Sequence, residues 1–526
     1  MTVGGRKENL LAALVLFVAI AAVFGQTVQH SHHLDEIETI RINPVFHRGS
    51  GVTLSQVLGS RLVQQQVPGA TDPVALASIG LDHFLWHRQV WGFHLTQLLL
   101  HFTVAMLFFL GLRQRVRDFR FALCLAVAFA IHPLVVEPVA GLNFRADLLA
   151  ALGTLTAFAL VFRARNATHR TRIIATYAGA FVALTLGCLS KETGYVAPFL
   201  LVILDLFAPA NARAPRRTQR TGWMVLAAAV AVGVGWRAWA TGGWFTVGPG
   251  IATSSAGIGM RLANGVWGLW AGLLKTVVPT GLSPAYAVRV FDDWREYLFA
   301  AVLCLGIAAL ALVAWRLRKR EPHVTEGFAF ALCAAMPTMG IVALTALQAD
   351  RYMYLPLMGL LAALGALLSG DTARLLWDRR FNSLPAIGAV LLGFFAWQAF
   401  NQASRWRSDE ILWNHAVSVA PNAAGAWTGL AWAEFGDNRM AAARAAATAV
   451  ELEKRPETYE ALAHANMAEG NVLGACQNLD NALRVSRAPP SSRLLQKAGL
   501  CLRSAFQPRE STALLKRAVS ISPWLF

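Results

Sequence analysis

Long apolar runs recur along most of the chain and are separated by short polar segments. An α-helix needs about twenty such residues to cross the hydrocarbon core of a bilayer. The runs predict about eleven membrane spans, near 9–25, 92–112, 121–140, 146–162, 173–189, 194–208, 222–240, 297–316, 326–347, 353–369 and 384–400. We therefore predict an all-α fold whose larger part, residues 1–404, is a polytopic membrane bundle.

The orientation of the bundle follows from its arginine-rich loops. Five loops are basic, and they contain Arg113, Arg115, Arg117 and Arg120; Arg163, Arg165, Arg170 and Arg172; Arg213, Arg216, Arg217 and Arg220; Arg316, Arg318, Lys319 and Arg320; and Arg374, Arg379 and Arg380. Basic loops remain on the cytoplasmic side. All five lie there together with the N-terminus only if the further apolar run 260–279 does not cross. We interpret that run as a re-entrant or interfacial helix, which leaves the C-terminus extracytoplasmic.

The predicted extracytoplasmic side carries a long loop, 26–91, and several short turns. Residues 76–94 are aromatic and mildly amphipathic, which is typical of a helix that lies in the membrane interface.

The C-terminal segment, 405–526, has a different pattern, with alanine-rich helical periodicity and a repeat. Its prolines fall at Pro421, Pro456, Pro490 and Pro523, which are 35, 34 and 33 residues apart. A period near 34 with paired alanine-rich helices is typical of tetratricopeptide repeats. We predict a helix at 409–420 and about three further helix pairs, forming either a rigid cap on the bundle or a concave surface for a protein or peptide.

Composition supports the membrane interpretation and narrows the function. The chain is 56% hydrophobic and 15% charged, where a soluble protein would carry about a quarter charged residues. The net charge of +17 lies mainly in the basic loops, so it does not indicate nucleic-acid binding. The six cysteines have no CxxC spacing, which gives no support for a zinc or redox motif. Cys476 and Cys501 would be able to pair in an oxidising compartment.

Acidic and basic residues gather in the predicted extracytoplasmic turns. Asp35 and Glu36 follow the first span, and paired carboxylates there suit a general base and its partner or, equally, a solvated loop. The other turns carry Glu137, Arg145 and Asp147; Lys191 and Glu192; and Asp350 and Arg351. Charges at a membrane edge are usually paired. An ion pair between Arg145 and Asp147 or Glu137 would therefore satisfy these charges without any function. If the turns cluster, Arg145, Lys191 and Arg351 would form an anion site suited to phosphate. The histidines do not form a metal triad on one element.

In their order, these motifs resemble the transmembrane and tetratricopeptide-repeat O-mannosyltransferase family and its bacterial relatives, which are type C, lipid-donor glycosyltransferases. The resemblance is carried by LDEIETIRINP, WGFHLTQLLLH, HPLVVEPVAGLNFRADLLAAL, LSKETGYVAPFLLVILDL, ADRYMYLP and WRSDEILWNHAVSVAPNAAGAW, which together span nearly the whole chain. The chain departs from the family pattern in two places. It has Asp72 where the family has an arginine before the interfacial helix, and Asp35-Glu36 where the family has paired aspartates.

The resemblance implies a transferase that takes a sugar from a polyprenyl-phosphate carrier and passes it to a protein hydroxyl or an envelope glycan. Asp35 would be the catalytic base and Glu36 would help to position the acceptor or the base. Arg145, Lys191 and Arg351 would hold the lipid phosphate, with Glu137, Asp147, Glu192 and Asp350 as supporting residues. No metal ligand is implied, and whether a divalent metal is needed stays open, as does the identity of the sugar.

Two other classes remain as alternatives. A non-enzymatic membrane scaffold would use the repeats to bind an envelope protein. A transporter is disfavoured, because the charges gather at one face and not at the middle of the membrane. The composition and topology suit a bacterial inner membrane with the repeats in the periplasm, although an endoplasmic-reticulum protein would have the same topology.

Overall fold

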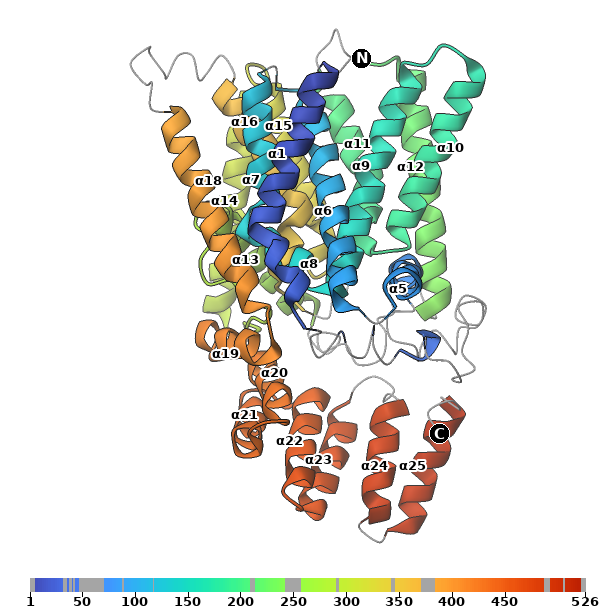
Figure 1. Cartoon of the computed structure of the whole chain (residues 1–526), viewed down its shortest axis with the longest axis vertical. Helices are drawn as coiled ribbons and strands as arrows, with labels where there is room; N and C mark the ends of the chain where they lie inside the picture. The colour runs from blue at the N-terminus through green and yellow to red at the C-terminus, as the bar shows by residue number, and fades with distance from the viewer. Residues whose placement is uncertain are drawn as a thin grey trace.

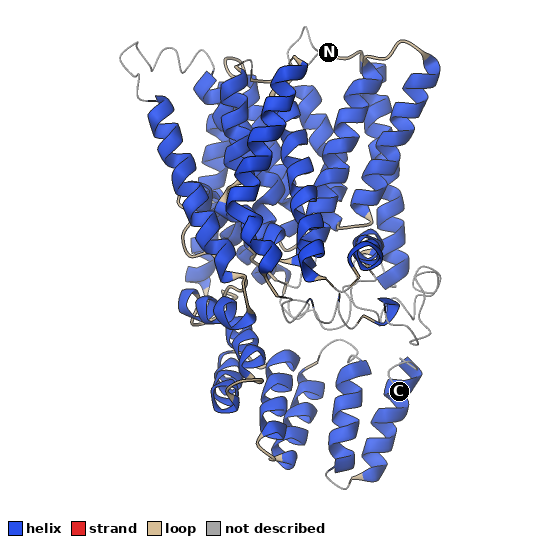
Figure 2. Cartoon of the chain, in the orientation of Figure 1, coloured by secondary structure: helices blue, strands red, loops and turns tan. Residues whose placement is uncertain are grey.

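The structure is a computed structural model of the chain. It describes residues 5–31, 36, 40, 43–46, 71–87, 89–116, 118–208, 213–241, 257–289, 293–341, 346–369, 384–486, 492–504 and 507–521. Within these ranges every regular element is a helix (Figure 2). A bundle of long helices occupies one part of the molecule, and a row of short helices extends from one of its ends (Figure 1).

Seven helical segments of the described chain are long and apolar enough to cross a membrane. They are Arg6–Gln29, Val90–Leu112, Leu142–Arg165, Arg170–Cys188, Arg216–Ala240, Trp294–Leu317 and Asp350–Leu368. These segments include α1 (Arg6–Phe24), α6 (Val90–Leu112), α9 (Arg145–Arg165), α10 (Arg170–Cys188), α12 (Arg216–Thr241), α14 (Trp294–Leu317) and α16 (Tyr354–Ser369). Each of the seven coincides with a run predicted from the sequence, so a multi-helix bundle with membrane-spanning character is confirmed.

The prediction of eleven spans is not confirmed. The run 121–140 forms α7 (Phe119–Ala130) and a second segment, Pro133–Ala140, which are bent by 48° and would together make an eighth span. The break falls at Pro133, which has no N–H to continue the helix, while His132 Nδ1 accepts from the Leu134 N–H at 3.2 Å. In the other predicted runs, α11 (Ala197–Leu206) and α15 (Pro322–Ala335) have only 10 and 14 residues, and α18 (Leu384–Arg405) is not among the seven.

Helices α13 and α5 bear on two further predictions. α13 (Ile258–Val277) is a helix of 20 residues that is also not among the seven, and its interfacial or re-entrant placement stays a prediction.

The helix expected over 76–94 is instead two helices. α5 (Pro73–Trp86) lies crosswise to the bundle, and the chain turns at His87, whose φ is 57°, before α6 begins (Figure 1).

Small residues let neighbouring helices approach closely. A Cβ on Gly153 of α9 would lie 2.6 Å from the Ala183 carbonyl oxygen of α10, and one on Gly327 of α15 would lie 2.5 Å from the Gly359 oxygen of α16. Both distances are below any real contact, so each pair of helices packs backbone against backbone, as is common between membrane helices.

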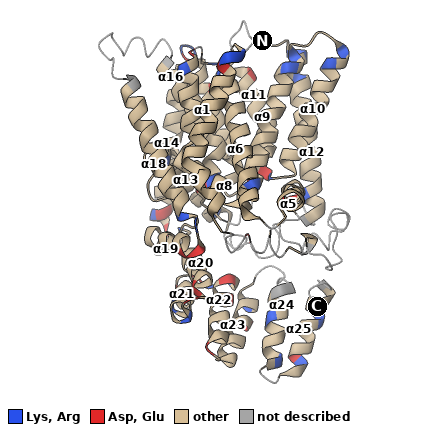
Figure 3. Cartoon of the chain, viewed as in Figure 1, with Lys and Arg blue, Asp and Glu red and all other residues tan. Residues whose placement is uncertain are grey.

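Positive side chains mark one end of the bundle. Lys and Arg gather at the end that carries the N-terminus, which we call the basic end (Figure 3). The opposite end, beside the row of short helices, we call the array end. The positive-inside pattern predicts that the basic end is cytoplasmic.

The C-terminal segment forms a row of helices, here called the array. It comprises α19 (Asp409–Val419), α20 (Ala424–Glu434), α21 (Arg439–Leu452), α22 (Pro456–Ala468), α23 (Val472–Val485), α24 (Ser492–Ser504) and α25 (Pro508–Ile521). Each helix packs on the next, with buried alanines such as Ala431, Ala446 and Ala461 between them. The helices predicted from the repeat are therefore present, while their classification as a tetratricopeptide solenoid stays a prediction.

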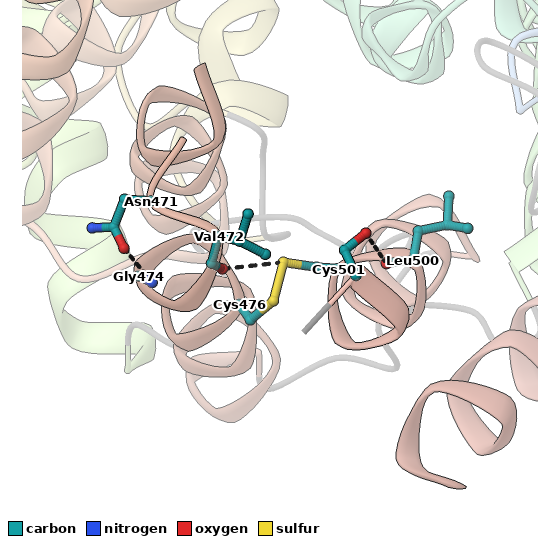
Figure 4. Close-up of a disulfide and its surroundings, with 7 residues drawn as sticks. Asn471, Val472, Gly474, Cys476, Leu500 and Cys501 are labelled. Atoms are coloured by element: carbon teal, nitrogen blue, oxygen red, sulfur yellow. Dashed lines mark hydrogen bonds between the residues drawn. A yellow bond between two sulfur atoms is a disulfide. The ribbon is translucent and has the colours of Figure 1, made fainter. Parts of the chain in front are cut away.

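Two connections stabilise the array. Cys476 of α23 and Cys501 of α24 form a disulfide, as the sequence allowed (Figure 4). At the other end of the row, Ala285 packs against a cluster of buried alanines that includes Ala416 of α19, and His415 Nε2 lies 3.0 Å from the Leu282 carbonyl oxygen. The first helix of the array is therefore docked on the segment that follows α13.

Candidate functional site

Arg145 is the first residue of α9 and one of the most buried side chains of the bundle. Its Nη1 is 2.5 Å from Asp82 of α5, and both side chains are 1% exposed. Its Nε donates to Gln97 of α6 at 3.1 Å, and its Nη2 donates to the Phe93 carbonyl oxygen at 3.1 Å. Arg145 thus joins three helices, and its guanidinium is already satisfied by groups of the chain itself.

The turn before α9 is also tied to the segment after α1. The Leu142 N–H donates to Glu36 Oε1 at 2.6 Å, and Glu36 is buried. This places one of the two predicted catalytic carboxylates beside the Arg145 contacts. Asp35, the predicted base, lies outside the described residues.

Lys191 and Asp147 form a second ion pair at the array end. Lys191 immediately precedes the 3-10 turn Glu192–Val196, and its Nζ donates to Asp147 Oδ2 on the first turn of α9 at 2.6 Å. Lys191 is 18% exposed and Asp147 is 5% exposed, so this cation is more accessible than Arg145.

Arg351 forms a third pair, with Glu137 of α8 (Val136–Ala140). Its Nη1 forms a salt bridge with Glu137 Oε1, and its backbone N–H donates to Glu137 Oε2 at 2.9 Å. The guanidinium also lies 4.4 Å from the centre of the Phe144 ring, which is a cation–π distance. Glu137 therefore fixes both the backbone and the side chain of Arg351.

A small cavity connects the second and third pairs. Asp147, Thr193, Arg351, Tyr352 and Tyr354 are among its lining residues. Arg351 thus lines the cavity directly, whereas Lys191 is linked to it only through its ion pair with Asp147. Arg145 does not line it and is held in the separate contacts to α5 and α6.

Asp350, predicted as a supporting residue, has its own set of partners. Its Oδ1 accepts from Lys275 of α13 at 2.9 Å, and its Oδ2 accepts from the Tyr286 hydroxyl at 2.7 Å. The Ser283 N–H also donates to Asp350 at 3.2 Å. Asp350 therefore ties α13 and the segment that docks the array to the residue next to Arg351.

Comparisons with known proteins agree with the order of the motifs. The chain is 24% identical to human protein O-mannosyl-transferase TMTC1 over 460 residues, which is 78% of this chain and 51% of that protein. It is 26% identical to human protein O-mannosyl-transferase TMTC4 over 421 residues, or 69% of this chain and 55% of TMTC4. The chain is a homologue of the TMTC proteins.

Mouse protein O-mannosyl-transferase TMTC1 is 28% identical over 211 residues, covering 38% of this chain and 22% of that protein. The chain therefore spans about half the length, or less, of these TMTC relatives. No family model matches the chain. The predicted resemblance is confirmed by the relatives named here.

One departure from the TMTC pattern has a structural counterpart. At Asp72, where the family has an arginine, Arg237 of α12 approaches from another helix, at 3.6 Å from Asp72 and 3.1 Å from Glu192. Burial raises the pKa of Asp72 to about 7; the Glu192 charge adds to this effect, while Arg237 and Lys191 oppose it. A positive charge is thus present beside position 72, supplied by α12.

Several residues of this region were not predicted from the sequence. Asp82, Arg237, Lys275 and Tyr286 each bind a predicted residue or its neighbour. Asp82, Arg237 and Lys275 are charged residues inside apolar runs. Such a charge needs a partner, so its position in the sequence would have been the signal.

Two buried histidines have hydrogen-bond partners within the bundle. His101 Nδ1 lies 2.8 Å from the Tyr354 hydroxyl, and His132 Nε2 lies 3.1 Å from the Thr276 carbonyl oxygen. Among the residues that the structure describes, no three His, Cys, Asp or Glu side chains gather as a metal site.

Proposed function

We propose that the chain is an integral-membrane glycosyltransferase that moves a sugar from a polyprenyl-phosphate carrier to an acceptor at the array end. The observation that carries the proposal is one cavity lined by Arg351 and by Asp147, the partner of Lys191, at the end where Glu36 is fixed. The names of the TMTC relatives support a protein hydroxyl as the acceptor, and an envelope glycan is the other acceptor class.

In the proposed reaction, Asp35 takes the proton of the acceptor hydroxyl, and the hydroxyl oxygen attacks the anomeric carbon of the sugar. The bond between that carbon and the phosphate oxygen breaks, and the lipid phosphate leaves with both bonding electrons. Lys191 and Arg351 stabilise the charge that develops on the phosphate. The attack from the opposite side inverts the anomeric configuration.

The carboxylates act through these cations. Asp147 positions Lys191 and Glu137 positions Arg351, so the phosphate meets groups whose orientation is already set. Arg145 was predicted to bind the phosphate too. Because its donors are engaged by Asp82, Gln97 and Phe93, we assign it instead the positioning of α5 and of the turn that binds Glu36.

The test is a transfer assay with the full chain in proteoliposomes, supplied with polyprenyl-phosphate mannose or polyprenyl-phosphate glucose and a hydroxyl-bearing peptide. Asp35→Asn should lower kcat by at least about a hundredfold, as expected for loss of a general base. Asp437→Asn, an exposed change in the array, is the control and should have no effect. Unchanged transfer by Asp35→Asn would remove Asp35 from the mechanism.

A membrane scaffold is the second candidate, and one observation favours it. Each predicted cation already has a carboxylate partner in the bundle, which satisfies the need for pairing without any ligand. Deletion of the gene in the source cell separates the two candidates. The transferase predicts an extracytoplasmic protein or polymer that loses a sugar, whereas the scaffold predicts unchanged glycans.

We place the protein in a bacterial inner membrane, with the basic end cytoplasmic and the array in the periplasm. The basic loops support this orientation. The Cys476–Cys501 disulfide supports an oxidising compartment for the array.

A further inference from the structure

A second and larger cavity lies in the half of the bundle nearest the basic end. Its volume is about 130 Å³. Five helices line it: α6, α9, α11, α15 and α16. We call it the basic-end cavity.

The lining of the basic-end cavity is apolar over most of its depth and polar at one end. Phe108, Leu155 and Phe330 are typical of its walls. The polar members are Gln114 and Arg115 just after α6, and His323 and Glu326 on the first turns of α15. Since α6 ends and α15 begins at the basic end, these polar groups form a rim there.

The polar groups of the rim share one carboxylate. Glu326 is 3% exposed, and it accepts from Arg115 Nε at 2.5 Å and from His323 Nδ1 at 2.7 Å. Arg115 engages this carboxylate through Nε. The two Nη groups of an arginine can bind phosphate oxygens bidentately, and basic loops surround this end of the bundle.

The basic-end cavity is separate from the candidate transfer site but close to it. The two cavities share no lining residue. They do share three helices: the two linings are about one helical turn apart on α9 (Ala151 and Leu155) and on α15 (Ala334 and Phe330), and two residues apart on α16.

We propose that the basic-end cavity binds an anionic phospholipid of the adjoining leaflet, with its phosphate at Arg115 and one acyl chain among the apolar side chains. The apolar walls match a hydrocarbon chain, and the Arg115 guanidinium, at the end of the bundle where Lys and Arg gather, matches a phosphate. Basic pockets between membrane helices on the cytoplasmic side bind such head groups. This proposal does not depend on sugar transfer.

The test uses the full chain in lipid nanodiscs that contain a clickable phosphatidic acid with a photoreactive group on its acyl chain. After irradiation, labelled peptides are mapped by mass spectrometry. We expect the label on the lining segments of α6, α15 and α16. A label confined to other parts of the chain would overturn the proposal.

Two glycines with open space around them allow a test variant and a matched control. A Cβ on Gly111, which lines the basic-end cavity, or on Gly393 of α18, which does not, would meet no atom within 4 Å. Gly111→Leu should fill the cavity and lower the label at least about tenfold, since each methylene kept out weakens binding about fourfold. Gly393→Leu should label as the wild type does, and equal labelling of both variants would refute the site.

Two further measurements keep the result decisive. Ala362→Leu fills the same cavity from α16, and replaces Gly111→Leu if the latter does not purify as a monodisperse protein. Arg115→Gln should reduce labelling by the phosphatidic acid but not by a neutral diacylglycerol carrying the same photoreactive chain. A wild-type protein that labels equally with both lipids would contradict the role of the rim.

Discussion

The bundle and the array each contain an arginine–aspartate ion pair of nearly the same length, in opposite surroundings. Arg145 and Asp82 are 2.5 Å apart and 1% exposed, whereas Arg484 and Asp480 of α23 are 2.7 Å apart and 76% and 53% exposed. Water screens the exposed pair, which contributes little, while loss of one member of the buried pair leaves an uncompensated charge. The distance between the two charged groups therefore does not by itself indicate how much an ion pair contributes to stability.

The interiors of the two regions differ in the same way. At its array end the bundle buries charged and polar groups such as Arg145, Glu137 and Asp350. The array buries mainly alanine, with a disulfide between α23 and α24. Buried charge costs desolvation energy, and within a membrane protein it commonly marks a functional region. This difference locates the proposed chemistry in the bundle and not in the array.

The largest effect is expected from breaking the buried pair. Arg145→Ala should lower the free energy of unfolding by about 3–5 kcal/mol, because Asp82 then remains buried without its positively charged partner. Unfolding of the detergent-solubilised protein by heat or denaturant measures this. The matched change in the array, Arg484→Ala, should cost no more than about 1 kcal/mol.

A double change tests the cause of that loss. Arg145→Met combined with Asp82→Leu removes both charges and should recover much of the stability. If Arg145→Ala and Arg484→Ala cost the same, burial does not distinguish the two pairs and the comparison fails.

The next effect concerns transfer rather than stability. Lys191→Met should lower kcat about 10²–10³-fold, the usual consequence of removing a group that stabilises developing charge. Steady-state kinetics with a polyprenyl-phosphate sugar measures it. A change confined to KM would assign Lys191 to binding alone, and an unchanged kcat would exclude it from the chemistry.

The disulfide should matter for the array and not for the bundle. Replacing Cys476 and Cys501 by serine should destabilise the array by roughly 3 kcal/mol, given the sequence separation of 25 residues. Limited proteolysis would show earlier cleavage within the array. Cys304→Ser, an exposed cysteine of α14, is the control, and equal sensitivity of both variants would contradict a local role.

The last effect is a pH dependence at Asp72. A carboxyl whose pKa is raised by folding binds its proton more tightly in the folded state, so its contribution to stability falls as pH rises from about 4 to about 7. The Tm of the wild type relative to Asp72→Asn should therefore decrease over that range. A difference in Tm that is constant with pH would contradict the raised pKa of Asp72.

Apolar runs in the sequence predicted the helices whose formation depends on hydropathy alone. A run such as 92–112 is apolar throughout, and it became α6 with nearly the same bounds. The run 121–140 is equally apolar on average but contains Pro133, where the helix breaks. Average hydropathy conceals such a break because one missing N–H hardly changes it.

The partners of the charged residues depend on packing and could not be predicted in the same way. Lys275 lies inside an apolar run with no evident partner nearby in the sequence, and the structure shows that it binds Asp350, 75 residues away. Arg145 was expected to pair with Asp147 or Glu137, but it binds Asp82 of α5. Each alternative satisfied the charge equally well, so only the arrangement of the helices decides between them.

The segment 281–289 connects the two regions. Through Ser283 and Tyr286 it holds Asp350, and through Leu282 and Ala285 it holds α19. The array is therefore attached to the bundle beside the candidate site. A small rotation of the segment would displace α25 much further than α19, because displacement grows with distance from the segment.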